Sequence, residues 1–338
     1  MLILGIESSC DDTGAAVVED GSIVLSSVVS SQDSIHAKYG GVVPELASRR
    51  HIESIIPVVE EALSSSGATL KDIDGIAVTQ GPGLVGSLLI GLTFAKSVSY
   101  AAKIPFTGVN HIEAHPFAAF LKGQGDDKEA PGFPAIAMIV SGGHTTLLLL
   151  KTHIEYEIIG TTLDDAAGEA FDKVAKLIGL GYPGGAAIDR VARDGNAESH
   201  RFTRPLISKG SLDFSFSGLK TAVLNFVRSM GSLSPEYIPD LAASFQVGAV
   251  DALVTKARWA LEKTGANDLI IAGGVACNLR LRTKAAVMAA SVGARLFIPP
   301  PQYCSDNGAV IAALGYHQLK KGVVGSIDMN ALPTWEGF

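Results

Sequence analysis

The chain has 338 residues, of which 47% are hydrophobic and 18% are charged. This composition excludes a disordered tail and leaves enough length for two domains of ordinary size. The net charge of −7 argues against a protein that binds nucleic acid through bulk positive charge. An RNA substrate would therefore need a local basic patch or a partner.

Targeting and redox features predict a cytoplasmic protein. No basic region precedes the apolar N-terminal segment, so no signal peptide is expected. The most apolar stretch, residues 134–150, is interrupted by the polar residues 141–145 and is not expected to span a membrane. Cys10, Cys277 and Cys304 are scattered, as in proteins of reducing compartments, and we expect small buried hydrophobes rather than metal ligands.

The first half of the chain predicts strands at residues 2–6, 15–19 and 23–29, followed by a helix over 43–63. The apolar residues of this helix have the spacing of one buried face: Ile52, Ile55, Ile56, Val59 and Leu63. A strand (73–79), a helix (87–103), a strand (106–109) and a helix (111–121) complete this half.

The second half repeats this order. It predicts strands at 135–140, 145–150 and 154–159, helices at 164–178 and within 217–263, and then a strand (269–272), a helix (278–291), a strand (295–298) and a helix from about 305. The duplication predicts an α/β protein with the actin-like ATPase or sugar-kinase fold, in which two RNase H-like lobes, residues 1–121 and 134–338, enclose a ligand cleft.

Several glycine-rich loops are candidates for nucleotide contacts. Residues 7–14 and 141–145 follow the first strand of each half, where small residues could cradle phosphate oxygens, although a hairpin turn explains them too. Residues 80–84 could form an anion site or a structural strand-to-helix turn. In the second half, Gly185 with Asp189 and Gly274 with Asn278 would let a base or ribose pack against the backbone.

A metal site is predicted from His111 and His115, which lie four residues apart on one face of a helical turn. No glutamate directly follows His111, so this is not the zinc-protease motif, and two surface histidines are the alternative. Asp306 lies near the start of the last helix, and the duplicated fold would bring it to the same cleft as a third ligand. Alternatively Asp306 caps that helix, unless Ser305 is the cap.

Nine motifs along the whole chain have an order and spacing typical of one family. They are GIESSCDDT (5–13), GPGL (81–84), NHIEAH (110–115), SGGHT (141–145), DDAAGEAFDK (164–173), YPGG (182–185), FSFSGLKT (214–221), GGV (273–275) and SDNG (305–308). On these motifs the sequence resembles the universal tRNA threonylcarbamoyladenosine transferase family, formerly described as O-sialoglycoprotein endopeptidases.

The resemblance implies transfer of a threonylcarbamoyl group from threonylcarbamoyl-adenylate to the exocyclic amine of the adenosine 3′ of the anticodon (position 37), in tRNAs that read codons starting with A. It implies that His111, His115 and Asp306 hold one divalent metal ion, iron or zinc. It also implies partners: tRNA, a paralogous subunit and a small ATPase. The residues implied to hold the adenylate are Val140, Ser141, Gly142, Gly143, His144, Asp172, Gly185, Asp189 and Asn278.

Other roles stay open at this point. Pro116 follows His115, where the family usually carries an aliphatic residue, so the helix should start later and alter the orientation of His115. Asp11 is our candidate general base, unless it only caps backbone N–H groups. A metalloprotease and a non-catalytic scaffold are the rival functions. The clearest basic residues either contact tRNA or form an ordinary solvated surface. They are Arg49, Arg50, Arg190, Arg193, Arg201 and Arg204.

Overall fold

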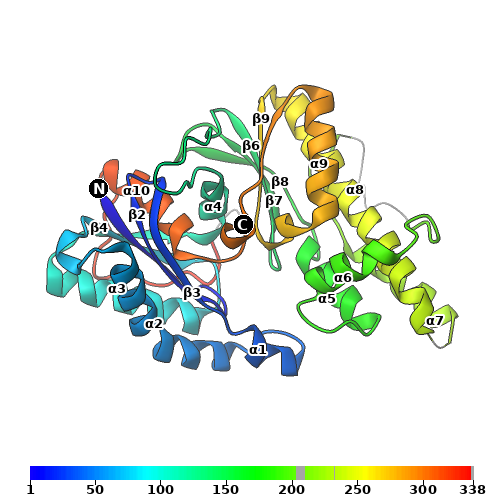
Figure 1. Ribbon diagram of the computed structural model, residues 1–338, viewed down its shortest axis with the longest axis horizontal. Helices are drawn as coiled ribbons and strands as arrows, with labels where there is room; N and C mark the ends of the chain where they lie inside the picture. The colour runs from blue at the N-terminus through cyan, green and yellow to red at the C-terminus, as the bar shows by residue number, and fades with distance from the viewer. Residues whose placement is uncertain (203–209, 232, 336–338) are drawn as a thin grey trace. The chain divides into compact units, whose positions relative to one another are not determined.

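The computed structural model describes residues 1–202, 210–231 and 233–335, which form two compact units (Figure 1). The first unit comprises Met1–Ala130 together with Ser305–Phe338, of which residues 305–335 are described, and the second comprises Pro131–Cys304. Each unit contains one mixed five-stranded sheet, which confirms the predicted α/β class.

The first unit is built on a sheet with the strand order β3-β2-β1-β4-β5. Its strands are β1 (Leu2–Glu7), β2 (Thr13–Glu19), β3 (Ile23–Ser30), β4 (Gly75–Gly81) and β5 (Phe106–Asn110). Its helices are α1 (Asp33–His36), α2 (Pro44–Ser66), α3 (Val85–Ala102), α4 (His111–Ala114) and α10 (Gly308–Lys320), with 3-10 turns η1 (Ala37–Tyr39), η2 (Leu70–Asp72) and η3 (His115–Ala119). β1 is antiparallel to β2 and parallel to β4, and β4 is parallel to β5. The carboxyl ends of β1, β4 and β5 therefore meet at one edge of the sheet.

The last helix, α10, packs on the sheet of the first unit rather than with the residues that precede it. Alternate residues of β1 face opposite layers: Leu4 belongs to the core under α2, whereas Gly5 faces α10. A Cβ on Gly5 would meet the carbonyl oxygen of Gly308 at 2.0 Å, so the helix rests directly on the strand. The predicted lobe of residues 134–338 therefore differs from the observed unit, since chain order does not reveal that this helix returns to the first sheet.

Helix α2 buries a different face from the predicted one. Ile55 and Val59 are buried, as expected, whereas Ile52 and Ile56 are 60% and 54% exposed. The buried face of the helix includes Val58 instead, which is 6% exposed. The five predicted positions span a wider arc of the helix than the sheet covers, so the prediction is wrong at Ile52 and Ile56.

Among the described residues, α3 is the one helix long and apolar enough to cross a membrane by length and composition. One face of α3 packs on β4 and α2, and Leu88, Leu92 and Ala95 are buried there. Core helices of soluble proteins pass the same test of length and composition. This packing places one face of α3 in the core of the first unit, and 28% of the helix is buried.

The second unit repeats the topology of the first, with the strand order β10-β9-β6-β7-β8. Its strands are β6 (Ala135–Val140), β7 (Thr145–Leu150), β8 (Tyr156–Thr161), β9 (Asp268–Ala272) and β10 (Arg295–Phe297). Its helices are α5 (Ala167–Leu177), α6 (Gly184–Val191), α7 (Ser217–Ser229), α8 (Ile238–Thr264) and α9 (Leu279–Val292), with 3-10 turns η4 (Ala192–Asp194), η5 (Pro235–Tyr237), η6 (Gly274–Cys277) and η7 (Pro301–Tyr303). β6 is antiparallel to β7 and parallel to β9, as β1 is to β2 and β4, which confirms the predicted duplication.

Candidate functional site

A capped turn at the end of β5 positions the first histidine. The side-chain oxygen of Asn110 accepts hydrogen bonds from the N–H groups of Ile112 at 2.8 Å and Glu113 at 3.2 Å. These bonds satisfy donors that the first turn of a helix leaves unpaired, so α4 begins sharply at His111. The imidazole of His111 is thereby held at the carboxyl edge of the sheet.

Pro116 changes the geometry of the second histidine. α4 ends at Ala114, and the chain continues as the 3-10 turn η3 from His115 to Ala119. Proline lacks the N–H that an α-helix needs at this position, which accounts for the tighter turn. The predicted continuous helix over residues 111–121 is therefore wrong, and so is the expected later start, because α4 begins at His111. His115 still lies on the same side as His111.

The third predicted ligand, Asp306, does not cap α10, because a neighbouring residue does so instead. Asn307, not Ser305, caps α10, because its side-chain oxygen accepts from the N–H groups of Ala309 at 3.0 Å and Val310 at 3.1 Å. Asp306 therefore does not serve as the cap. Its side chain is only 24% exposed and turns toward the histidines.

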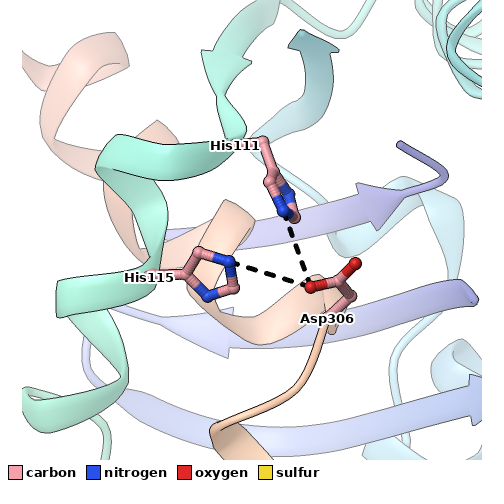
Figure 2. Close-up of side chains that lie close together, drawn as sticks. All are labelled: His111, His115 and Asp306. Carbon is pink, nitrogen blue, oxygen red and sulfur yellow. Dashed lines mark ion pairs between the residues drawn. The ribbon is translucent and has the colours of Figure 1, made fainter. Parts of the chain in front are cut away.

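The three side chains converge on a small volume (Figure 2). The Oδ1 atom of Asp306 lies 3.5 Å from Nε2 of His111 and 3.7 Å from Nε2 of His115. Both distances exceed those of ordinary N–H···O hydrogen bonds, roughly 2.7–3.2 Å. One ligand atom from each residue lies within 4.8 Å of the other two, and in the described part of the chain this is the single such group found.

All three ligands belong to the first unit. Sequence reasoning expected two lobes to contribute them, because Asp306 follows the whole second half of the chain. That expectation is wrong, since α10 returns to the first sheet and brings Asp306 beside the end of β5. The metal-site candidate therefore lies within one compact unit.

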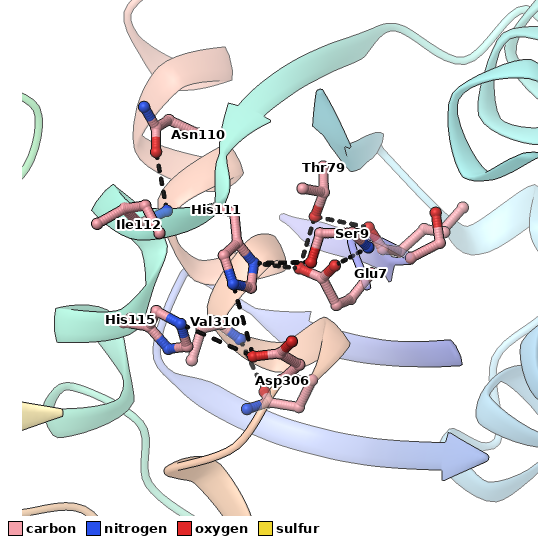
Figure 3. A network of polar contacts seen from close by, with 12 residues as sticks. Glu7, Ser9, Thr79, Asn110, His111, Ile112, His115, Asp306 and Val310 are labelled. Atoms are coloured by element: carbon pink, nitrogen blue, oxygen red, sulfur yellow. Dashed lines mark hydrogen bonds and ion pairs between the residues drawn. The ribbon is translucent and has the colours of Figure 1, made fainter. Parts of the chain in front are cut away.

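Glu7, at the carboxyl end of β1, holds His111 in place (Figure 3). Its Oε2 atom accepts from Nδ1 of His111 at 2.9 Å and from the hydroxyl of Thr79 at 2.7 Å. Its Oε1 atom accepts from the N–H of Ser9 at 2.5 Å. A carboxylate that binds one imidazole nitrogen fixes the tautomer and directs the other nitrogen toward a metal.

Sequence reasoning placed Glu7 only in a phosphate loop and missed this contact. The available signal was topological, because the carboxyl ends of parallel strands meet at one edge of a sheet. Glu7 ends β1, Thr79 lies two residues before the end of β4, and His111 directly follows β5.

The electrostatics of this cluster favour positive charge. Burial lowers the pKa of His111, but Asp306 and Glu7 outweigh it and raise the pKa to about 9. Burial raises the pKa of Glu7, but the charge of His111 and three hydrogen bonds bring it down to about 2. Burial raises the pKa of Asp306 to about 6, although the charge of His111 opposes this shift. The carboxylates that stabilise a charged imidazole would equally stabilise a metal cation.

The donor set fits a divalent transition metal. Two imidazole nitrogens and one carboxylate oxygen are ligands that zinc and iron both accept, and three protein ligands leave positions open for substrate. The two carboxylate–imidazole distances, 3.5 and 3.7 Å, are close to the roughly 3–3.5 Å expected between ligand atoms around a metal with bonds of about 2.0–2.2 Å. His111, His115 and Asp306 therefore form a metal-site candidate.

An acidic loop lies beside the metal-site candidate. Asp11, the predicted general base, is partly buried, and its charge contributes to raising the pKa of Asp306. The neighbouring Asp12 was not singled out from the sequence. Burial, Asp306 and Asp11 raise its pKa to about 7, although a hydrogen bond with Ser31 opposes the shift. A carboxyl group that titrates near neutral pH is suited to proton transfer, so Asp12 is a second candidate base.

Residues of the expected phosphate loop in the first half form hydrogen bonds with other parts of the first unit. The hydroxyl of Ser8 donates to the carbonyl of Ser87 at 3.0 Å, and the carbonyl of Ser9 accepts from the N–H of Leu84 at 2.8 Å. The N–H of Gly83 likewise donates within the unit, to the carbonyl of Pro333 at 3.2 Å. Residues 80–84 therefore form the structural turn rather than an anion site.

The corresponding loop of the second unit is a tight turn with open space above it. The N–H of Ser141 donates to the carbonyl of His144 at 2.8 Å, and the N–H of His144 donates to the hydroxyl of Ser141 at 3.2 Å. A Cβ on Gly142 or Gly143 would meet nothing within 4 Å. Val140 precedes the turn as the buried last residue of β6. The hairpin and phosphate-loop interpretations are thus compatible here.

Close contacts connect this turn to the other predicted adenylate residues. A Cβ on Gly168 would meet the carbonyl of Ser141 at 2.4 Å, so α5 begins directly against the turn. One turn further along α5, Oδ1 of Asp172 accepts from the N–H of Gly184 at 2.7 Å, which ties α5 to the start of α6. Gly185 follows in α6 and faces open space.

Asp189 joins α6 to the start of α9. Its Oδ1 atom accepts from Nε2 of Gln246 at 2.9 Å and from the N–H of Leu279 at 3.2 Å, and its Oδ2 atom pairs with Arg193 at 3.1 Å. Asn278 caps α9 and is buried. A pocket of about 330 Å³ opens beside Asp189, Gln246 and Leu279. The second unit thus brings the predicted adenylate residues into one connected region.

Two further groups of residues have mixed outcomes. Arg49, Arg50, Arg190, Arg193 and Arg201 are exposed, and Arg204 lies outside the described residues. Two of the exposed arginines form ion pairs on the surface, Arg50 with Glu53 and Arg193 with Asp189. Of the cysteines expected to be buried hydrophobes, Cys304 is fully buried but Cys277 is exposed, so that expectation is wrong at Cys277.

Comparison with known proteins identifies the family. The sequence profile of tRNA N6-adenosine threonylcarbamoyltransferases matches residues 23–313. The protein of that name from Geotalea uraniireducens (strain Rf4) is 53% identical over 336 residues, which cover 99% of this chain and 96% of the relative. The one from Geobacter sp. (strain M21) is 54% identical over 336 residues, with the same coverage of 99% and 96%.

Solved structures share the fold at low identity. HypF from T. kodakarensis superposes with a TM-score of 0.62 at 16% identity, over 95% of this chain and 48% of that one. Component A of the (R)-2-hydroxyglutaryl-CoA dehydratase of Acidaminococcus fermentans superposes with a TM-score of 0.54 at 15% identity, over 95% and 99%. These likenesses confirm the predicted actin-like ATPase fold and carry no function. The sequence matches identify the family: this chain belongs to the tRNA N6-adenosine threonylcarbamoyltransferase family, whose members form threonylcarbamoyladenosine in tRNA.

Proposed function

We propose that the chain transfers the threonylcarbamoyl group from threonylcarbamoyl-adenylate to N6 of the adenosine 3′ of the anticodon (position 37), in tRNAs that read codons starting with A. The observation that carries this proposal is the buried His111–His115–Asp306 cluster held by Glu7, in a chain of this family. A metalloprotease has less support, because the relatives are transferases and no glutamate directly follows His111.

The adenylate is held by the second unit. The turn Ser141–His144 offers backbone N–H groups to phosphate oxygens, and open space lies above Gly142 and Gly143. Asp172 and Asp189 are suited to ribose hydroxyls, because a carboxylate accepts up to about four hydrogen bonds. Val140, Gly185 and Asn278 complete this set.

The protein's own groups position the reacting atoms. His111, His115 and Asp306 would hold one divalent ion, iron or zinc, which when bound stabilises negative charge on a substrate oxygen. Glu7 keeps Nδ1 of His111 protonated and so leaves Nε2 free to act as a ligand.

The transfer is a single acyl exchange. N6 of the adenosine forms a bond to the carbamoyl carbon, the bond from that carbon to a phosphate oxygen of the adenylate breaks, and AMP leaves with the electron pair. The proton that N6 loses passes to a carboxylate, for which Asp11 is our candidate and Asp12 the alternative. Both lie in the acidic loop beside Asp306.

The protein works in the cytoplasm with tRNA, a paralogous subunit and a small ATPase. The net charge of −7 supports a need for help with tRNA, because phosphate contacts and counterion release supply much of nucleic-acid affinity. We expect weak tRNA binding by the isolated chain and steep salt dependence once the partners are added. Filter binding at two salt concentrations measures both, and tight, salt-sensitive binding by the chain alone would contradict partner dependence.

Alanine variants of His111, His115 and Asp306 test the metal site. Each variant should keep its fold but lose most of its bound metal. Its transfer activity on tRNA should fall by more than the roughly 10–100-fold loss that is typical when a residue hydrogen-bonded to a metal ligand is replaced. Asp194→Ala, an exposed carboxylate, is the matched control. Full transfer by a variant that binds no metal would reject the site, and metal-dependent cleavage of a glycoprotein would favour the protease instead.

A further inference from the structure

Two of the three cysteines meet in the second unit, at the turn that ends it. Cys277 closes η6 and is exposed, whereas Cys304 follows η7 and is fully buried. The two thiols shift each other's pKa, lowering that of Cys277 and raising that of Cys304. The Sγ atom of Cys277 lies 4.0 Å from the carbonyl of Pro301, and that of Cys304 lies 3.5 Å from the carbonyl of Pro299. The same short turn therefore contacts both sulfur atoms.

A fixed cation lies beside the two thiols. Nε of Arg282 donates to the carbonyl of Ala276 at 2.7 Å, next to Cys277, and Nη2 donates to the carbonyl of Pro299 at 2.8 Å. Nη2 also lies 3.5 Å from Sγ of Cys304. Because two carbonyls anchor it, the guanidinium stays at the pair, where it stabilises a thiolate and opposes the binding of a metal cation.

The surroundings give the two thiols different reactivity. The thiol of Cys304 lowers the pKa of Cys277 most, Arg282 lowers it further against burial and Asp189, and the result is about 7. Cys277 is therefore a thiolate to a substantial degree at neutral pH. Cys10 in the first unit is the opposite case, since burial and the nearby Asp11 raise its pKa.

We propose that Cys277 and Cys304 form a redox-modification site, at which hydrogen peroxide converts the two thiols into a reversible disulfide. The exposed Cys277 thiolate attacks a peroxide oxygen, the O–O bond breaks, and water leaves after protonation, so that Cys277 becomes a sulfenic acid. The sulfur of Cys304 then attacks that of Cys277, the S–O bond breaks, and a second water leaves as the disulfide forms. Two thiols lose two electrons, and hydrogen peroxide is reduced to two waters. A small dithiol reverses the reaction.

This site goes beyond the transfer reaction and does not depend on it. Cys277 directly precedes Asn278, the cap of α9, and Cys304 stands two residues before Asp306 in the chain. The disulfide would join these two segments covalently. No residue assigned above to the metal or the adenylate takes part in the oxidation itself.

The experiment treats the reduced full-length chain with one equivalent of hydrogen peroxide, then unfolds it and alkylates the remaining thiols. We expect the number of free thiols to fall from the three in the sequence to one, with Cys10 still alkylated. A tryptic digest should contain a cross-link between the separate peptides that carry Cys277 and Cys304, and dithiothreitol should remove it. In the native protein, Cys277 should be alkylated at least about tenfold faster than Cys10 at neutral pH.

Single variants separate this proposal from general oxidation. Cys10→Ser should keep the cross-link, Cys277→Ser should lose it, and Cys304→Ser should leave a sulfenic acid on Cys277 that a cyclic dione traps. The proposal fails if peroxide leaves all three thiols alkylatable, if Cys277 proceeds to sulfinic acid while Cys304 stays free, or if Cys10 is the partner. Should a variant not fold, the cross-link map of the unsubstituted chain decides the question.

Discussion

Replacing Glu7 with glutamine changes one oxygen into an amide nitrogen at a buried point beside the metal-site candidate. The Glu7 side chain is 1% exposed and accepts from His111 at 2.9 Å, Thr79 at 2.7 Å and Ser9 at 2.5 Å. An amide keeps one accepting oxygen and turns two N–H donors toward groups that are themselves donors. Whichever way the amide lies, at least one of these three hydrogen bonds is lost.

The expected magnitudes follow from these contacts. Loss of the contact that orients a metal-binding histidine typically lowers metal affinity about 10–100-fold, which corresponds to about 1.4–2.7 kcal/mol. The folded state should also lose about 1–3 kcal/mol, because a buried donor is left without its acceptor. Glu7→Gln should therefore bind metal weakly and still fold.

Competition with a coloured chelator measures the affinity, and thermal unfolding followed by circular dichroism measures stability. Glu53→Gln is the matched control, since Glu53 is 64% exposed and its ion pair with Arg50 lies on the surface. Thr79→Val removes one hydrogen bond from Glu7 but keeps the carboxylate, and should have a smaller effect on metal. If folded Glu7→Gln bound metal within twofold of the unsubstituted chain, Glu7 would not orient His111 and the reasoning would be refuted.

Three further predictions concern other parts of the chain. Burial and neighbouring carboxylates raise the pKa of Asp12 from 3.8 to about 7, so the folded state binds an extra proton in that range and loses stability as pH rises through 7. The Tm of Asp12→Asn should therefore exceed that of the unsubstituted chain by more at pH 8 than at pH 5. An equal difference in Tm at both pH values would refute the pKa shift. Asp189→Ala should weaken binding of a stable adenylate analogue at least about tenfold by calorimetry, because it removes a charged acceptor and the link from α6 to α9. Asp194→Ala should not weaken it. Equal affinities of Asp189→Ala and the unsubstituted chain would reject the adenylate placement. Gly315→Ala should lower stability by about 1–3 kcal/mol in urea unfolding, because its Cβ would lie 2.2 Å from that of Ala77, and an unchanged midpoint would show that α10 can move off the sheet.

The sequence by itself determined the local elements and the order in which they occur. Strands such as β6 (Ala135–Val140) and β7 (Thr145–Leu150) have the predicted bounds, because buried strands are short apolar runs ended by polar turns. The His111–His115 pair was also visible, since two side chains four residues apart meet on one turn whatever the rest of the fold does. The repetition of these elements, together with the motifs, predicted two lobes of the same type.

Only the tertiary structure decided which distant segments meet. Glu7 reaches His111 because parallel strands align their carboxyl ends, and Asp306 joins the first unit because glycines let α10 rest directly on β1. The exposure of Ile52 and of Cys277 likewise depends on which neighbours cover them. Periodicity and spacing describe a chain over a few turns, whereas these contacts depend on packing between segments far apart in sequence, which no local pattern records.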